Sequence, residues 1–346
     1  MSGKRQHFIP QFLLRGFSSH STRYDYFTWV FRKGCVPFNT NIKNIGVEGQ
    51  FYSMDGESFV DDSITLAESS FGDLVAELRE VPNTSKVDSM RVAELIAHLE
   101  ARTRHFRQNF LESGTYLLDQ FLKFAADPAL FGDYMRRKIS QDPHIMTEAL
   151  SKELDKNGIT QTALPAALIA IQPFLADAFT VSAAQMAPMV QELRKGMPAK
   201  LKDAAKTGHL RALSASISPE VKVRIFSKLT YRIARQRQDA AFVLGDSVVL
   251  FAVASERRFK TFYEKDDQLL AVLLPVSSEA CLIGTTDGQL YELDAISKAV
   301  ASCSLEFFIA SQDTPLNREL GKSIASKAHI ISRQEIEEII DDVLDQ

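Results

Sequence analysis

The sequence contains few of the residues that form covalent or metal cross-links. Three cysteines occur in 346 residues, at Cys35, Cys281 and Cys303, and no two of them have the spacing of a zinc-binding pair. An odd number of scattered cysteines is typical of a reducing compartment, so we expect a cytoplasmic protein. A chain of this length buries roughly 75% of its unfolded surface on folding, so it needs neither disulfides nor a structural metal.

The chain also lacks an excess of charge of either sign. It has 40 Lys and Arg against 44 Asp and Glu, a net charge of -4. This balance excludes a strongly basic coat for nucleic acid, so any such contact would have to be local. Two basic segments, residues 195–206 and 222–237, are candidates for that contact, with a solvated face as the alternative for both.

No uninterrupted apolar run has the length of about 20 residues that a membrane span requires. The longest apolar stretch, residues 163–179, contains Pro165, Gln172, Pro173 and Asp177, which is typical of a buried or kinked helix. Polar residues near the N-terminus also interrupt the apolar segment that a secretory signal needs. We therefore expect no membrane association.

The first third of the sequence predicts a β-hairpin followed by helices. Residues 24–41, YDYFTWVFRKGCVPFNTN, place aromatic and β-branched residues on both sides of a turn at Gly34. A helix is predicted from Asp61, where carboxylates suit a first turn. A second, longer helix is predicted from Thr84 or Ser85, and its apolar stripe reaches Phe110. Polar residues at steps of four, four and three form a ridge beside that stripe, at Glu94, His98, Arg102 and His105.

The later sequence changes from helical to β-rich. From Tyr116 to Lys206 the pattern is helical, with prolines at joints or in first turns, namely Pro128, Pro143, Pro165, Pro173, Pro188 and Pro198. After Ser218, β-branched runs predict strands, and the tail from Asp313 is helical again. The expected fold class is α+β, in which β-rich N- and C-terminal segments form a small mixed sheet and the middle is predominantly helical.

These patterns divide the chain into three predicted segments. Residues 1–125 hold the N-terminal motif, the hairpin and the long helices, and residues 126–218 form a helical middle or insertion. Residues 219–346 form a β-rich segment with C-terminal helices, which we expect to pack with 1–125 as one α+β domain. Whether the helical middle is a separate domain stays open at this stage.

Local motifs for metal or phosphate binding are absent from the sequence. No pair of histidines has the HExxH spacing, although distant ligands such as His7 and Asp246 could still meet in the fold. The glycines Gly46 and Gly49 lack the helix and lysine of a phosphate-binding loop. No metal site is predicted, and the sequence identifies no cofactor.

Several segments, in this order, resemble a known family. They are QHFIPQF at 6–12, NIKNIGVEGQFY at 41–52, ARTRHFR at 101–107, FVLGDSVVLF at 242–251 and LNRELGKSIASKAHIIS at 316–332. Together they resemble the family of unknown function DUF4238, whose members typically open with Gln-His-Tyr/Phe-Val/Ile-Pro-Gln-Phe. The resemblance covers most of the chain and implies no established activity.

The resemblance implicates a set of candidate site residues: Gln6, His7, Pro10, Gln11, Phe12, Arg102, Arg107, Asp246, Pro275, Ser277 and Asn317. The sequence departs from the family pattern in two places. Ser247 and Val248 follow the aspartate where the family usually has Asn or His and then Pro. Arg104 stands where a proline is common after Arg-Thr. Any role that depends on those family side chains is not expected here.

His7 and Asp246 are the first two candidate catalytic residues. Imidazole titrates near neutrality and can act as a general acid or base. The alternative is that the His7 ring caps a backbone group while its apolar neighbours anchor the N-terminus. A buried aspartate needs a partner, so Asp246 can orient His7 or bind an arginine. Its alternative role is in a turn or bulge permitted by Gly245.

Arg102 is the third candidate, because a guanidinium can bind phosphate or carboxylate through two hydrogen bonds. The alternative is a structural ion pair with Asp246 or Glu68. A solvated helix face is the alternative for Arg107 and His105. The candidate substrate-binding residues are Gln6, Gln11, Arg107 and Asn317.

The leading hypothesis is a hydrolase of phosphodiester or nucleotide bonds that uses His7 as acid and base with Asp246 and Arg102. Its expected ligand is a nucleic acid or nucleotide, and the resemblance implies a defence or toxin context. The alternative is a non-catalytic interaction module, in which the N-terminal motif is a structural clasp and the helical middle with its acidic tail binds a protein. The sequence does not determine the oligomeric state.

Overall fold

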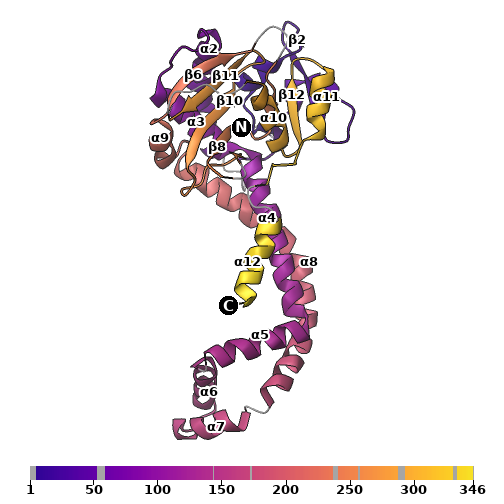
Figure 1. Cartoon of the computed structure of the whole chain (residues 1–346), viewed down its shortest axis with the longest axis vertical. Coiled ribbons are helices and arrows are strands. Elements are labelled where there is room, and N and C mark those ends of the chain that lie inside the picture. The colour runs from indigo at the N-terminus through magenta and orange to yellow at the C-terminus, as the bar shows by residue number, and fades with distance from the viewer. Residues whose placement is uncertain are drawn as a thin grey trace. The chain divides into compact units, whose positions relative to one another are not determined.

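The computed structural model describes residues 5–52, 59–142, 144–171, 174–236, 241–255, 258–286, 293–329 and 333–345. The chain divides into two compact units (Figure 1). The first comprises Met1–Phe110 and Ala205–Ile330, and the second comprises Leu111–Ala204 and Ile331–Gln346. The first combines sheets and helices, whereas the described part of the second is helical. The α+β class is therefore confirmed.

A five-stranded antiparallel sheet lies in the core of the first unit. In spatial order its strands are β6 (Thr230–Arg235), β11 (Ala280–Thr285), β10 (Leu269–Pro275), β8 (Leu250–Val253) and β9 (Phe259–Lys260). Every residue of β8 and β11 is buried. Burial of both faces explains why these segments are continuous apolar runs instead of alternating polar and apolar residues.

A second sheet joins the two ends of the chain. Its strands are β2 (His20–Ser21), β3 (Tyr26–Arg32), β12 (Phe307–Ala310) and β7 (Leu244–Gly245), with β4 (Phe38–Asn41) also paired to β3. Phe31 lies opposite Phe308 in the register, and the two rings stack with centroids 4.9 Å apart. The predicted hairpin is confirmed as β3 and β4. The predicted sheet built from both ends of the chain is confirmed, although its described strands are antiparallel and not mixed, and other described strands form two further antiparallel sheets.

The N-terminal segment is fixed to the first unit by pairing and burial. Strand β1 (Arg5–His7) pairs antiparallel with β5 (Val47–Gly49), so that His7 lies opposite Val47. The chain then turns at Pro10 into α1 (Gln11–Leu14) and the 3-10 turn η1 (Arg15–Phe17). Leu13, Leu14 and Phe17 are fully buried. This terminus is therefore part of the core.

The second predicted helix begins later than its sequence pattern suggests. Helix α3 (Ser89–Arg102) has Asp88 as its N-cap, and the Asp88 side chain accepts hydrogen bonds from the N–H groups of Met90 and Arg91. The residues before it pair with β6 instead of forming a helix: Thr84 lies in a turn (φ 63°) and donates to the carbonyl of Ile233, and Lys86 forms an antiparallel bridge with Arg232. The prediction of a helical start at Thr84 or Ser85 is therefore wrong, since pairing with a distant strand overrides local propensity.

The same helix also ends earlier than predicted. Thr103 has an extended backbone (ψ 142°), and α4 (Arg104–Ala126) starts after it. The sequence predicts no break at Thr103 because the helical spacing of apolar residues continues past it. The break falls where the family pattern carries a proline, and the residue before a proline favours an extended backbone.

Helices cover the sheets of the first unit. Helix α2 (Phe59–Glu80) carries Asp61 and Asp62 in its first turn, as predicted. Helix α9 (Glu220–Phe226) packs on α3. Helices α10 (Leu293–Cys303) and α11 (Pro315–Lys322) both contact β12, as Figure 1 shows.

The second unit contains most of α4 and further helices, namely α5 (Pro128–Gln141), α6 (His144–Lys156), η3 (Gln161–Ala163), α7 (Leu164–Ile171), most of α8 (Leu175–Ala215) and α12 (Arg333–Asp345). Pro128 lies in the first turn of α5, which Asp127 caps. Pro188 and Pro198 lie inside α8 and not at joints. Each frees the carbonyl four residues earlier, at exposed positions that water can reach. Pro143 and Pro173 lie outside the described residues. None of the described helices combines the length and apolar content needed to cross a membrane.

Candidate functional site

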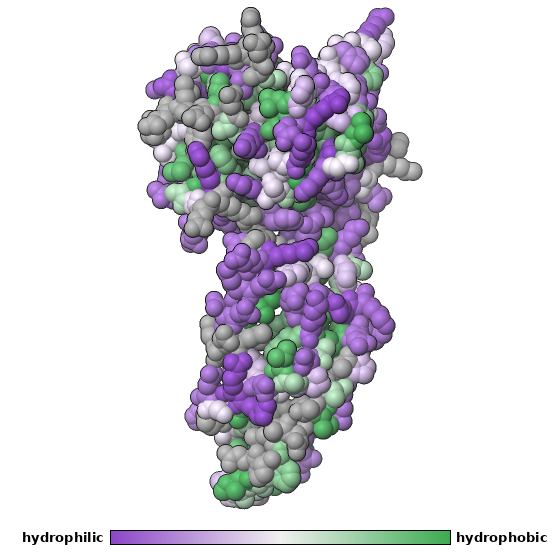
Figure 2. Space-filling model, turned by 45° about the vertical axis from the view of Figure 1, so that its right-hand side comes forward, coloured by the Kyte–Doolittle hydropathy of each residue, from purple (hydrophilic) through white to green (hydrophobic). Residues whose placement is uncertain are grey.

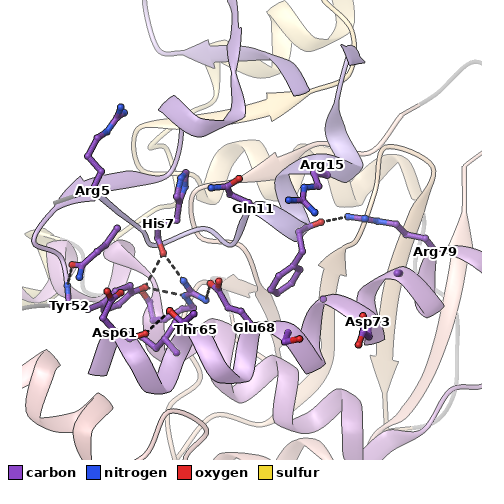
Figure 3. A pocket seen from close by; sticks show the side chains of 17 residues that line it. Arg5, His7, Gln11, Arg15, Tyr52, Asp61, Thr65, Glu68, Asp73 and Arg79 are labelled. Atoms are coloured by element: carbon purple, nitrogen blue, oxygen red, sulfur yellow. Dashed lines mark hydrogen bonds and ion pairs between the residues drawn. The ribbon is translucent and has the colours of Figure 1, made fainter. Parts of the chain in front are cut away.

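A pocket of about 790 Å³ opens in the first unit between the N-terminal segment and α2 (Figure 3). This volume lies within the range of small-molecule sites, roughly 300–1,000 Å³. Five of the predicted site residues line the pocket, namely Gln6, His7, Gln11, Phe12 and Arg102. Arg107, Asp246 and Asn317 are not among its described lining residues.

One face of α2 forms a wall of the pocket. Its lining residues recur at helical spacing and include Asp61, Thr65, Glu68, Gly72 and Ala76. Residues three and four apart lie on the same side of a helix. Another face of α2 carries the buried Leu74, Val75 and Leu78. The amphipathic pattern of α2 therefore sets which polar side chains face the pocket.

The backbone after His7 is held close to a glycine turn. The N–H of Phe8 donates to the carbonyl of Gly46 at 2.8 Å, and Ile9 is buried beside it. Gly46 has a φ of 61°, and a Cβ there would fall 2.7 Å from the Cβ of Ile9. Glycine is required on both counts. This close approach fixes the chain immediately after His7.

Gln6 joins β1 to the segment after β5. Its Oε1 accepts a hydrogen bond from the N–H of Tyr52 at 2.6 Å, and the residue is 4% exposed. The backbone of Tyr52 therefore already occupies the Gln6 carbonyl oxygen. Substrate binding by Gln6 stays a prediction.

Arg102 is buried and has three kinds of partner. Its Nη1 lies 2.6 Å from Oε1 of Glu68, and its Nε donates to the hydroxyl of Tyr52 at 3.1 Å. Its Nη2 donates to the backbone carbonyl of His7 at 2.6 Å. The ion pair with Glu68 confirms one of the two structural partners considered from sequence. Arg102 therefore ties α3 to α2 and to the end of β1.

His98 supports Arg102 from one turn earlier in α3. Its Nε2 lies 3.2 Å from Nη1 of Arg102, and its Nδ1 lies 3.1 Å from the carbonyl of Ile217. A guanidinium only donates, so Nε2 accepts, and Nδ1 carries the proton that is donated to Ile217. Burial, with repulsion from Arg102, lowers the pKa of His98 to about 3. The ring is neutral at pH 7.

Buried neutral histidines make the fold sensitive to acid. Burial also lowers the pKa of His209 to about 4. At a pH below about 6.5, the histidine pKa in the unfolded chain, His98 binds a proton in the unfolded chain but not in the folded one. The free energy of unfolding therefore falls as pH falls. Between about pH 6.5 and pH 4, His98 alone should lower the free energy of unfolding by about 3 kcal/mol. Denaturant unfolding across this range should give a shallower pH slope for His98→Gln than for wild type. His20→Gln, at an exposed histidine, is the control, and equal slopes for all three proteins would contradict the prediction.

The half-buried imidazole of His7 lines the pocket at the end of β1. Burial lowers the pKa of His7, and the nearby backbone of Ile45 only partly offsets this effect, so the ring is neutral at pH 7. Its Nδ1 is buried and has no hydrogen-bond partner in the described parts of the chain. A buried polar atom without a partner costs about 1–3 kcal/mol. Such atoms in native proteins are often explained by a catalytic role or by bound water or ions.

Arg79 closes the pocket at the far end of α2. It donates to the backbone carbonyls of Phe12 and Val276, at 2.6 and 2.8 Å. Gly16 leaves room for this arrangement, because a Cβ there would lie 2.6 Å from Nη2 of Arg79. Arg79 therefore holds α1 against the main sheet, while the exposed Arg15 lines the pocket beside it.

Arg107 and His105 lie in other surroundings. The guanidinium of Arg107 lies over the ring of Phe51, 4.1 Å from its centroid, and pairs with Glu48 at 2.7 Å. His105 is 3% exposed, with Nε2 3.1 Å from the carbonyl of Cys303. The alternative of a solvated face is wrong for His105, because the break at Thr103 turns this part of α4 toward the core.

Asp246 caps the chain at the start of β12. Its carboxylate accepts hydrogen bonds from the N–H groups of Leu305, Glu306 and Phe307, at 2.8, 2.6 and 3.2 Å. Burial raises the pKa of Asp246 to about 6, against the effect of these three bonds. The structure therefore does not bring Asp246 to the pocket that His7 lines.

The side chain of Asn317, like that of Asp246, is hydrogen-bonded to the protein backbone. Its Nδ2 donates to the carbonyl of Gln312 at 2.8 Å, and its backbone N–H is capped by the hydroxyl of Thr314. Both contacts hold the start of α11. A substrate-binding role for Asn317 stays a prediction.

Tyr52, Asp73 and Arg79 line the pocket but were not predicted from the sequence. A signal for Arg79 was present, because Asp61, Glu68 and Arg79 lie seven and eleven residues apart and so fall on one side of a helix, whereas Asp73 departs from that spacing. No comparable signal identifies Tyr52, whose partners are distant in sequence. Within the described residues, no three His, Cys, Asp or Glu side chains are placed to hold a metal ion.

Comparison with known proteins extends the resemblance noted in the sequence. The profile of a family described as "Protein of unknown function (DUF4238)" matches residues 5–313. No curated protein and no solved structure matches the chain. The matched range includes every candidate residue that lines the pocket. The chain therefore belongs to the family of proteins of unknown function DUF4238.

Proposed function

We propose that the protein is a hydrolase of phosphodiester or nucleotide bonds whose site is the pocket between the N-terminal segment and α2. The observation that carries this proposal is the His7 imidazole, which lines the pocket with its Nδ1 buried and unpaired among the described residues. A neutral imidazole at pH 7 can accept a proton from water and return it to a leaving group.

In this proposal Arg102 positions His7 and does not touch the reacting atoms. Its guanidinium binds the backbone carbonyl of His7, and its ion pair with Glu68 holds a carboxylate at the pocket. The sequence hypothesis gave Asp246 the role of the carboxylate at the site, and in this proposal Glu68 has that role. Asp246 has a structural role in this proposal, because its carboxylate holds the start of β12.

Replacement of His7 by alanine tests the proposal. The anchoring contact with Arg102 uses the backbone carbonyl of His7, so His7→Ala removes the imidazole and leaves that contact in place. We expect at least a 100-fold loss of turnover on nucleotide or oligonucleotide substrates, as for loss of a general acid–base group. Thermal unfolding should shift by no more than a few degrees.

His20→Ala is the matched control, since this exposed histidine lies outside the lining of the pocket. It should keep wild-type turnover. Unchanged turnover in His7→Ala, or a wild-type protein inactive on the whole panel, would reject the hydrolase. The defence or toxin context belongs to the same proposal, and growth of cells that express wild type or His7→Ala tests it.

A second candidate is a non-catalytic module that binds a protein through the helical unit. Figure 2 shows apolar surface among hydrophilic side chains there. The exposed apolar residues of this unit include Leu117, Phe121, Leu130, Ile169, Phe174 and Met189. Exposed apolar side chains gathered in one region mark interaction surfaces. Polar substitution of Phe121 and Ile169 would abolish function in cells under this candidate, whereas His7→Ala would have no effect.

A further inference from the structure

We propose that the pocket binds mononucleotides and dinucleotides and excludes longer strands of DNA or RNA. This inference rests on the proposed function, because it names the substrate class of the same site. It is carried by the distribution of charge on the two walls of the pocket.

The two walls of the pocket differ in charge. The N-terminal segment contributes Arg5 and Arg15, both exposed at the pocket. Helix α2 contributes Asp61, Glu68 and Asp73 along the facing wall, where Glu68 is paired with Arg102, and it contributes Arg79 at its far end. Figure 3 shows the two arginines on one side and the three carboxylates on the helix opposite. The pocket is therefore a dipolar site and not a uniformly cationic one.

The other two arginines of the pocket are already engaged. Arg79 donates to two backbone carbonyls, and Arg102 is bound by Glu68, Tyr52 and the backbone of His7. Arg5 and Arg15 still carry exposed N–H groups. Arg5 donates to Asn44 at 3.3 Å, and Arg15 lies over the ring of Tyr26. Two arginines suit one or two phosphates.

The charge of the α2 wall does not suit a polynucleotide. A strand carries one phosphate per nucleotide, and proteins that follow such a backbone line its path with cations. The carboxylates of α2 would repel the phosphates of a strand that crossed the pocket. The same carboxylates can accept hydrogen bonds from ribose hydroxyls and base amino groups, as acidic side chains do in nucleotide sites.

Apolar surface on which a base can lie is present among the charged groups of the pocket. Phe12, Gly72 and Ala76 supply it, beside Arg15 and Arg79. A Cβ added at Gly72 would lie 3.8 Å from the nearest atoms of Phe12, so the helix tolerates a side chain at this position. A large side chain at Gly72 would extend into the space left for a ligand. Gly72→Leu is therefore a steric probe that leaves every charge in place.

Binding and turnover are measured separately. Calorimetry on wild type uses adenosine monophosphate, and calorimetry on His7→Ala uses the dinucleotide ApA and an oligoadenylate of about 20 nucleotides, so that cleavage does not interfere. Turnover on the dinucleotide and the oligomer is measured with wild type. We expect the small nucleotides to bind at least tenfold more tightly than the oligomer, with little dependence on salt.

Charge variants test each wall. Arg15→Glu should weaken binding of adenosine monophosphate at least tenfold, whereas Arg23→Glu, at an exposed arginine outside the lining, should not. Asp73→Lys should raise affinity for the oligomer at least tenfold, whereas Asp62→Lys, exposed on the same helix, should not. Gly72→Leu should abolish binding of the monophosphate.

The outcomes separate this inference from the proposed function. Turnover of the oligomer but not of the dinucleotide, with steep salt dependence, would overturn the inference and uphold the hydrolase. Tight binding of small nucleotides without any turnover would overturn the hydrolase and uphold the ligand class. Failure of the monophosphate and the dinucleotide to bind would overturn the inference.

Discussion

Replacement of Arg102 by methionine is expected to lower the free energy of unfolding by about 3–5 kcal/mol, the range found when one partner of a buried ion pair is removed. The guanidinium is 1% exposed. Methionine has a similar length but cannot donate, so the backbone carbonyl of His7 and the carboxylate of Glu68 would lose their donor. The loss is large because Arg102 is the buried partner and its hydrogen bonds cannot be replaced by water there, whereas the carboxylate of Glu68, 31% exposed, can still be hydrated.

Denaturant unfolding monitored by circular dichroism measures this effect. Arg91→Met is the matched control, because Arg91 pairs with Glu77 at an exposed site and such pairs contribute about 1 kcal/mol or less. Arg102→Met as stable as Arg91→Met would show that the network around His7 does not hold the fold. Arg102→Met together with Glu68→Gln should be less destabilising than the sum of the two single changes, because they share one interaction.

Replacement of Asp246 by alanine is expected to lower the free energy of unfolding by about 3 kcal/mol or more. Three backbone N–H groups would lose their acceptor, one buried at Phe307 and two half-buried at Leu305 and Glu306, and an N–H left unpaired away from water costs about 1–3 kcal/mol. The measurement belongs at about pH 8, since burial raises the pKa of Asp246 to about 6 and the carboxylate must be charged to accept all three bonds.

Asp25→Ala is the control for this change, because Asp25 pairs with Lys43 at an exposed site. Its loss should stay below about 1 kcal/mol. The Asp246 prediction also separates a structural carboxylate from a catalytic one. An Asp246→Ala protein of unchanged stability but without turnover would place Asp246 in the chemistry and contradict the structural assignment.

Local sequence patterns predicted the elements that depend on neighbouring residues. The hairpin of β3 and β4 follows from residues 24–41, and Gly34 adopts the φ of 71° that its turn requires. The start of α2 follows from the carboxylates of its first turn. These predictions hold because a turn or a helix start is determined within about four residues.

The limits of α3 could not be predicted in the same way. Its pattern from Thr84 to Phe110 is that of one helix. The segment before Ser89 is not helical because it pairs with β6, about 150 residues later in the chain. Local helix propensity does not include the energy of pairing between distant segments, and it is a weak preference that tertiary contacts override.

The candidate site shows the same division. Glu68 was one of two structural partners considered for Arg102, and the structure selects it. The other, Asp246, binds a segment about 60 residues further along the chain. Sequence spacing alone does not distinguish these outcomes, because both partners are carboxylates at long separation from Arg102.

The sequence by itself determined the α+β class, the family and the importance of the N-terminal motif, since composition, periodicity and motif order are properties of the chain. The tertiary structure alone decided how each motif side chain is used. Gln6, Arg102 and Asp246 bind backbone groups, and Gln6 and Arg102 line the pocket together with His7 and Gln11, whereas Asp246 does not. The physical reason is that a polar side chain must satisfy its hydrogen bonds wherever the fold buries it, and only the packed chain determines which groups are within reach.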